Sequence, residues 1–375
     1  MDENGIREWL SRNQPDWTLI AATGPANALD GGIVLRDFAP YVASINAAGV
    51  VAFQAAWRDG RLNATGLFCG DGTAVTQLHQ SGESWQFFSH PAINDDGVLS
   101  VYAERPLAQQ AVLLWRNHAW AAPAASGPAL LSIGPLGPTM NAGSAVAFRA
   151  TDVHGVGGVY VADANGTRLL AACGSYFAQF HGLPVINQSG NVLIRADLPD
   201  GTQGIYLIRQ PSGNTASPAA TASHIDLVAD TLGVFSGLGL FPMMNDANCV
   251  IFAATRKSGG AAIYSRNADA ENGALQTLVD SSAGFQSLRG ALINQAGPVA
   301  FFATPPGGEL GIYRFARTAQ NAPARVLAVG DALLNSHVAG FALNPVSCNQ
   351  AGQLALRVAL ADGQQLILRA GPLPE

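Results

Sequence analysis

The sequence has few charged residues and no long apolar segment. Only 12% of its 375 residues are charged, Lys257 is the single lysine, and the arginines are scattered. Proteins that bind nucleic acids need clustered basic residues, so we expect no nucleic-acid partner. No apolar run reaches the length of a membrane span, and the acidic, polar first residues do not resemble a secretory signal. These absences predict a soluble cytoplasmic protein, or a secreted one if a signal has been removed.

Cysteine is also scarce, and no two cysteines have the close spacing that is typical of metal binding. The four are Cys69, Cys173, Cys249 and Cys348. We interpret them as small core residues rather than zinc ligands or disulfide partners. The sequence has neither a Gly-x-Ser-x-Gly elbow nor a glycine-rich phosphate loop before a helix, which disfavours such hydrolases and nucleotide-binding proteins. We expect no cofactor.

An asparagine recurs seven times, at intervals of 48, 47, 46, 58, 49 and 55 residues. The seven positions are Asn46, Asn94, Asn141, Asn187, Asn245, Asn294 and Asn349. Each asparagine opens a version of one phrase, which runs from Asn46 to Phe53 in the first copy. The 42 glycines and 21 prolines fit short strands joined by tight turns. This period predicts an architecture of repeated units.

Each repeat is long enough for four strands. In the third repeat, 141–144 predicts a turn, strands follow at 145–150, 157–162 and 167–172, and 177–186 leads to the next asparagine. Seven such units predict a single all-β domain, a seven-bladed β-propeller with four antiparallel strands in each blade. We interpret the repeated asparagines as turn residues whose side chains bond nearby backbone groups; a ligand role is the alternative.

The last repeat is one strand short. After its asparagine, residues 353–360 and 364–370 supply only two strands before the chain ends. Residues 17–24 resemble residues 168–174 and 326–330 of other repeats, so we expect this segment to complete the last blade and leave no open edge. Residues 1–16 form an extension, and the spacing of their apolar side chains predicts a short helix. Those side chains are Ile6, Trp9 and Leu10.

The repeated phrase resembles a known tandem repeat. Residues 46–53, 141–148 and 294–301 are similar to the bacterial repeat named for its NxxGxxAF consensus, whose usual sequel Gly-Ile-Tyr stands at 204–206 and 311–313. The second repeat departs from the consensus in its Val-Ala-Phe strand, and the fifth has asparagine in place of the glycine. The resemblance covers nearly the whole chain. It implies a protein of a kind that is often secreted or surface-anchored, and it implies no specific activity.

Candidate site residues are polar side chains that are not repeated from blade to blade. Propellers usually bind ligands where their innermost strands converge, and here the segment before each asparagine is predicted to be that strand. Most blades have apolar residues or glycine four to six positions before the asparagine. The exceptions are Tyr41, His90, His181, Arg289 and Asn344. Tyrosine and histidine suit proton transfer, and arginine and asparagine suit substrate binding.

A second set lies eight residues after the asparagine. Three blades have an arginine there, namely Arg149, Arg195 and Arg357. Guanidinium groups bind carboxylates or phosphates through paired hydrogen bonds, so these residues are candidate ligands of an anionic substrate. The alternative is structural, with each arginine bonded to carbonyls or acids of the adjacent blade, such as Asp197 or Glu104.

These residues favour two classes of function. The first is a metal-independent lyase, isomerase or cyclase that acts on an anionic or carbonyl-containing small molecule in the central channel. Metal binding by His90, His181 and His337 was weighed and is disfavoured, because no carboxylate stands out as their partner. The second class is a non-catalytic binding module or protein scaffold. A lectin is disfavoured because all six tryptophans fall in the first third of the chain.

Overall fold

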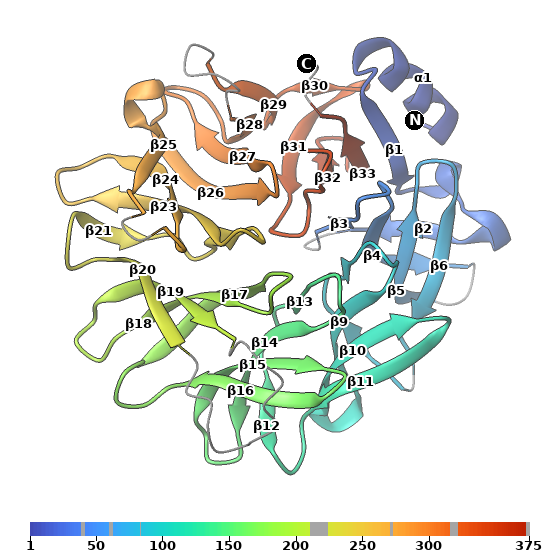
Figure 1. Ribbon diagram of the computed structural model, residues 1–375. Helices are drawn as coiled ribbons and strands as arrows, with labels where there is room; N and C mark the ends of the chain where they lie inside the picture. Colours follow the sequence, from blue (N-terminus) through green and yellow to red (C-terminus); the bar gives the residue numbers. More distant parts are fainter. Residues whose placement is uncertain are drawn as a thin grey trace. The chain divides into compact units, whose positions relative to one another are not determined.

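The computed structural model describes residues 1–38, 42–59, 63–82, 84–210, 224–270, 273–315 and 322–372. Strands predominate and form seven antiparallel sheets, each with four principal strands (Figure 1). This is the seven-bladed β-propeller fold predicted from the repeats. Two compact units can be distinguished. We call Met1–Ala122, Glu309–Gly311 and Arg325–Glu375 the terminal unit, and Pro123–Gly308 and Ile312–Ala324 the central unit.

The blades follow one another along the chain, and each pairs consecutive strands. Blade 1 comprises β2 (Val34–Asp37), β3 (Ser44–Ile45), β4 (Val51–Arg58), β5 (Asn63–Gly70) and β6 (Val75–Gln80). Blade 2 comprises β7 (Phe87–Phe88), β8 (Ala92–Ile93), β9 (Leu99–Glu104), β10 (Gln110–Arg116) and β11 (Ala119–Ala125). Blade 3 comprises β12 (Leu130–Ile133), β13 (Thr139–Met140), β14 (Val146–Asp152), β15 (Gly157–Asp163) and β16 (Gly166–Ala172). Blade 4 comprises β17 (Gln179–Ile186), β18 (Val192–Asp197), β19 (Gln203–Arg209) and β20 (His224–Asp230). Blade 5 comprises β21 (Phe235–Leu238), β22 (Met243–Met244), β23 (Cys249–Arg256), β24 (Ala261–Asn267) and β25 (Gln276–Asp280). Blade 6 comprises β26 (Ser287–Asn294), β27 (Gly297–Thr304), β28 (Gly311–Arg314) and β29 (Ala324–Ala328). Blade 7 comprises β30 (Ala332–Leu333), β31 (Ser336–Ala342), β32 (Leu354–Leu360), β33 (Gln365–Ala370) and β1 (Trp17–Ala22).

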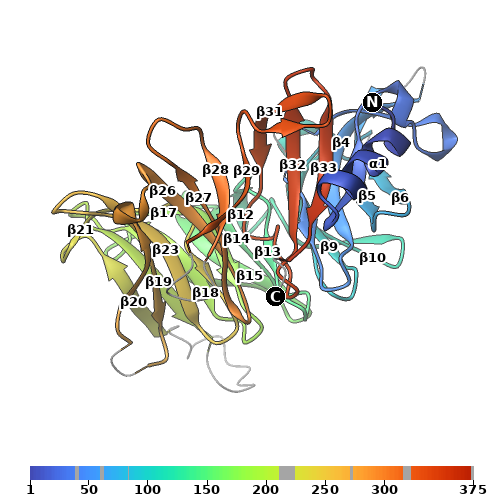
Figure 2. The same cartoon turned by 90° about the horizontal axis from the view of Figure 1, so that it is seen from above.

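The N-terminal strand completes the last blade, as predicted. Strand β1 pairs with β33 from Trp17 opposite Ala370 to Ala22 opposite Leu366. Helix α1 (Glu3–Asn13) precedes it and lies against this blade (Figure 2). Asp2 caps the helix by accepting a hydrogen bond from the Gly5 backbone, and Ile6 and Leu10 are buried. Among the described residues, no helix has the length and apolar character that a membrane span requires.

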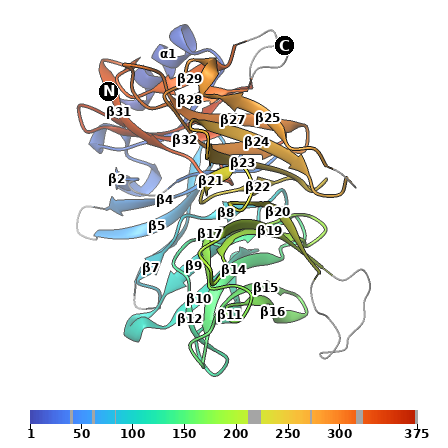
Figure 3. The same ribbon diagram turned by 90° about the vertical axis from the view of Figure 1, so that its left-hand side faces the viewer.

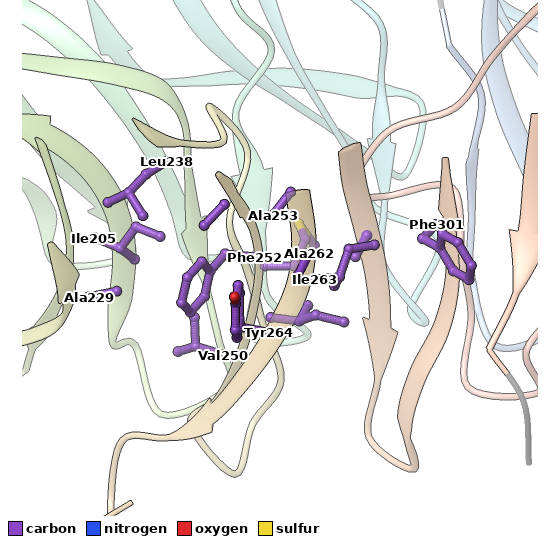
Figure 4. Close-up of a cluster of buried hydrophobic side chains, with 14 of the residues drawn as sticks. Ile205, Ala229, Leu238, Val250, Phe252, Ala253, Ala262, Ile263, Tyr264 and Phe301 are labelled. Carbon is purple, nitrogen blue, oxygen red and sulfur yellow. The ribbon is translucent and has the colours of Figure 1, made fainter. Parts of the chain in front are cut away.

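Aromatic pairs explain why the repeat conserves its Phe and Tyr positions along the chain. In blade 5, Phe252 of β23 stands opposite Tyr264 of β24, and the two rings stack at 5.7 Å (Figure 4). The two strands run side by side in Figure 3. Phe148 and Tyr160 form the same cross-strand stack in blade 3. Cross-strand aromatic pairs stabilise a sheet by about 0.2–1 kcal/mol beyond small residues, so the repeated motif is a packing unit.

The repeated asparagines hold turns, as predicted, and they also link blades. The Oδ1 atom of Asn46 accepts a hydrogen bond from the Val50 backbone at 3.0 Å, four residues later. Its Nδ2 atom donates to the carbonyl of Asn94, the corresponding residue of the next blade, at 3.2 Å. Asn349 donates in the same way to the Asn46 carbonyl at 2.9 Å. The link between blades was not predicted from the sequence.

The fourth residue of each phrase has a positive φ, which explains why five of the seven phrases have glycine there. Gly49 has φ of 79°, and Asn248, which replaces glycine in the fifth repeat, has φ of 52°. Asparagine tolerates this region better than most residues, so the departure from the consensus keeps the turn.

Candidate functional site

The candidate residues before each asparagine lie where the innermost strand leaves its ladder. His90 lies in the gap between β7 and β8, and both of these strands pair with β9. His181 and Arg289 stand at register shifts in β17 and β26. Asn344 follows the end of β31. Bulges re-aim side chains, so these positions are free of the strict alternation of a strand. Tyr41 lies outside the described residues.

In blade 4, His181 contacts a carboxylate. Its Nε2 atom lies 2.8 Å from Oδ2 of Asp197, and the two side chains are 22% and 29% exposed. The other carboxylate oxygen of Asp197 lies 3.2 Å from an Nη atom of Arg195, whose side chain is only 6% exposed. The Nε atom of Arg195 is buried and has no hydrogen-bond partner in the structure. The result is a partly exposed His–Asp pair backed by a buried cation.

Local backbone geometry positions this pair. Strands β17 and β18 pair regularly from Ile186 opposite Val192, and the register then shifts between Val185 and His181. Gly182, inside the shift, has φ of 64°. A Cβ atom at this position would overlap the carbonyl oxygen of Leu240 in blade 5. The site therefore depends on a glycine that lets the neighbouring blade approach.

The three candidate arginines have different surroundings. Arg149 donates a hydrogen bond of 2.6 Å to the carbonyl of Phe180, the residue before His181, and desolvation lowers its pKa. This bond matches the structural alternative, a contact with a carbonyl of the adjacent blade. Arg195 pairs with Asp197 on its own strand. Arg357 belongs to the terminal unit, and burial lowers its pKa. Its Nε atom is buried and has no hydrogen-bond partner among the described residues.

The remaining candidates do not join the His181 group. His90 is partly buried, and desolvation lowers its pKa to about 4, so it is neutral near pH 7. Asn344 uses its Oδ1 atom in a turn, where it accepts a hydrogen bond from the Val346 backbone at 3.0 Å. Arg289 is exposed and has no ion pair in the described structure. The structure thus brings His181 together with Arg195 and places Arg149 beside the adjacent residue.

Sequence reasoning missed the pairing of His181 with Asp197. Counting back from the turn at Asn187 would have brought the two residues together, because an unshifted hairpin places residue 181 opposite residue 197. In the structure the register shift places His181 opposite Arg195, and its side chain reaches Asp197 from there. Sequence reasoning also missed the exposed apolar residues Leu240 and Phe241, which lie beside Gly182. Among the described residues, no group of three or more His, Cys, Asp or Glu side chains is arranged to hold a metal ion.

Comparisons with known proteins show the fold and nothing finer. Neither the protein-family models nor the curated protein sequences give a match. Among solved structures, an oligogalacturonate lyase in complex with manganese is similar at a TM-score of 0.57 and 10% identity, over 92% of both chains. The polysaccharide lyase Uly1 is similar at 0.53 and 9% identity, over 90% of this chain and 91% of that one. Acylaminoacyl peptidase from Pyrococcus horikoshii is similar at 0.52 and 12% identity, over 88% of this chain and 52% of that one. The chain thus spans about half the length of this peptidase.

Proposed function

We propose that the protein is an enzyme of the lyase, isomerase or cyclase type, with His181 as its general base. The observation that carries the proposal is the partly exposed His181–Asp197 pair backed by the buried Arg195. The fold similarity adds that two lyases have propellers of this kind, although identities of 9% and 10% transfer no activity. That the repeats belong to the NxxGxxAF family is likewise a proposal, which rests on the sequence alone.

The geometry gives each residue a role in proton abstraction. Asp197 accepts a hydrogen bond from the Nε2–H group of His181, which leaves the Nδ1 lone pair available for a substrate proton. When His181 gains that proton, the adjacent carboxylate stabilises the imidazolium. Arg195 contacts the other oxygen of Asp197 at 3.2 Å and so holds the carboxylate in position. A suitable substrate has a C–H group beside a carboxylate or carbonyl, because that group delocalises the charge left on carbon when the proton moves to His181.

Deuterium exchange tests this proposal without knowledge of the product. The protein is incubated in D₂O with small carboxylates, 2-oxo acids and uronic acids, and proton NMR follows exchange of the C–H group beside the carbonyl. His181→Gln should slow exchange at least ~100-fold, which is the usual contribution of a general base. Asp197→Asn should slow it less, through loss of the favoured tautomer.

The chain supplies a matched control for this experiment. His224 and Asp226 form another His–Asp contact, at 2.6 Å on the outer strand β20, where the His224 side chain is 76% exposed. His224→Gln should leave exchange unchanged. The proposal is wrong if no compound of these classes exchanges with the wild-type protein, or if His181→Gln retains the wild-type rate.

The exposed apolar residues of blade 5 favour a second candidate, a protein-binding scaffold. Four large apolar side chains between residues 232 and 241 are exposed. They are Leu232, Val234, Leu240 and Phe241. Leu240 and Phe241 are neighbours in the chain, and exposed apolar side chains that gather in one patch mark protein-binding sites. An absence of exchange in all compounds, together with loss of a partner on Phe241→Ser, would favour the scaffold.

A further inference from the structure

A cavity of about 560 Å³ lies in the terminal unit, beside the strand that completes the last blade. The short helical turn Pro25–Asn27 bounds it on one side, β2 and the end of β4 on another, and the turn around Gln364 on a third. Its volume is within the roughly 300–1,000 Å³ range of small-molecule sites. All its lining residues belong to this unit, so the cavity is separate from the His181 pair.

Two arginines line this cavity. Arg58, at the end of β4, pairs across the ladder with Val34 of β2, and Arg36 lies two residues after Val34. Arg36 stands at a register shift between Leu35 and Asp37, and both arginine side chains line the cavity. In the described part of the chain, neither arginine makes a hydrogen bond or ion pair. By contrast, Arg209 and Arg256 each have carboxylate partners.

The charge of the cavity is positive. Among its lining side chains, Asp362 is the one acid, against two guanidinium groups. The Oδ1 atom of Asp362 already accepts a hydrogen bond from the Gln364 backbone at 3.0 Å. A guanidinium group presents five donors and stays charged at all physiological pH values. The lining therefore has more cationic donors than its own acid can satisfy.

One wall of the cavity is held in place by buried hydrogen bonds. The side chain of Asn27 is 4% exposed, and its Nδ2 atom donates to the carbonyls of Thr23 at 3.0 Å and Met1 at 3.3 Å. Gln364 donates to the same Met1 carbonyl at 2.9 Å. The Oδ1 atom of Asn27 is buried and has no hydrogen-bond donor among the described residues. A fixed wall lowers the entropy cost of binding.

We propose that this cavity binds a small anion, a carboxylate or phosphate compound, between Arg36 and Arg58. The two guanidinium groups supply paired, charge-assisted hydrogen bonds to the anionic group. The apolar side chain of Val34 also lines the cavity and would contact the rest of a bound ligand. The site does not depend on the proposed catalysis, so either proposal can fail without the other.

Titration calorimetry at low ionic strength tests the site, with inorganic phosphate and malonate as the probes. The variants are Arg36→Gln and Arg58→Gln, which remove one charge each from exposed side chains that have no described partner. Each should weaken binding at least about tenfold, because it removes one guanidinium group and its charge-assisted hydrogen bonds. Binding of phosphate alone would assign phosphate compounds to the site, and binding of malonate alone would assign carboxylates.

Arg12→Gln is the matched control. Arg12 is an exposed arginine of helix α1, outside the cavity, and its partner is Glu8. This variant should bind both probes as the wild-type protein does, and unfolding curves should show that all three variants fold. The proposal is overturned if neither probe binds the wild-type protein up to about 10 mM. It is also overturned if Arg12→Gln weakens binding as much as the cavity variants do, because the effect would then be one of net charge.

Discussion

Replacing Asn46 should destabilise the fold more than its place in a turn suggests. The side chain is 5% exposed and makes two hydrogen bonds, one to the Val50 backbone of its own turn and one to the Asn94 carbonyl of the next blade. Asn46→Ala removes both bonds and takes from the Val50 N–H its side-chain acceptor, whereas the Asn94 carbonyl keeps the hydrogen bond that it accepts from the Gly97 backbone at 3.1 Å. The orphaned N–H costs about 1–3 kcal/mol and the lost second bond about 0.5–1.5 kcal/mol, so we expect a loss of roughly 2–4 kcal/mol in the free energy of unfolding.

Asn46→Asp separates the two bonds. Aspartate keeps an oxygen for Val50, and it is as good a turn residue as asparagine. It cannot donate to the Asn94 carbonyl, and it places a carboxylate oxygen against that carbonyl. If the bond between blades matters, this variant should still lose more than about 1 kcal/mol.

The assay is urea unfolding, followed by circular dichroism and by tryptophan fluorescence. Asn165→Asp is the matched control, because Asn165 is exposed in the turn between β15 and β16. That variant should unfold with the wild-type protein. The reasoning is refuted if Asn46→Asp unfolds within about 0.5 kcal/mol of the wild type, because the asparagines would then serve their turns alone.

Two further predictions concern the inner strands. Gly182→Ala should lower the free energy of unfolding in urea by at least ~2 kcal/mol, because the new Cβ atom would overlap the Leu240 carbonyl. Gly201 also has a positive φ but faces open space, so Gly201→Ala should lower it only by the backbone strain of about 1 kcal/mol. His90 should titrate near pH 4 by NMR, below the ordinary value of about 6.5, because burial disfavours its charged form. Between these two pKa values the unfolded chain binds a proton at His90 that the folded chain does not, so the free energy of unfolding should decrease as the pH is lowered from about 6.5 to about 4. His90→Gln should remove this part of the pH dependence. An NMR midpoint near pH 6.5 for His90 would contradict the prediction.

Residues that the fold needs in every blade were predictable from the sequence. The asparagine period gave the number of blades, and the missing strand of the last repeat placed Trp17–Ala22 beside β33. Both follow from local rules, since every strand edge needs a partner and every turn needs its residue. The Phe252–Tyr264 stack belongs to the same class, because a hairpin register fixes which aromatic residues meet.

The contacts of the candidate site were predictable only in part. The sequence indicates His181 as a polar exception and Arg195 as one of three arginines at a repeated position, but it indicates their common partner Asp197 only as a structural acid for arginine. The shift of register around Gly182 decides which residues stand opposite one another, and no rule of alternation predicts where a strand departs from its ladder. The blade-to-blade bond of Asn46 was missed for a similar reason, because it depends on how two sheets pack and not on either alone.

These two outcomes have one physical cause. A backbone group inside a sheet must be paired, so the blades repeat wherever the ladder is continuous. The inner strands leave the ladder at the gap around His90 and at the shift beside His181, and there the side chains are no longer held to one face. At such breaks one blade can therefore direct a polar group where its neighbours have none. A propeller of this kind can therefore acquire a site in one blade, as we propose for blade 4, while the other six keep the fold.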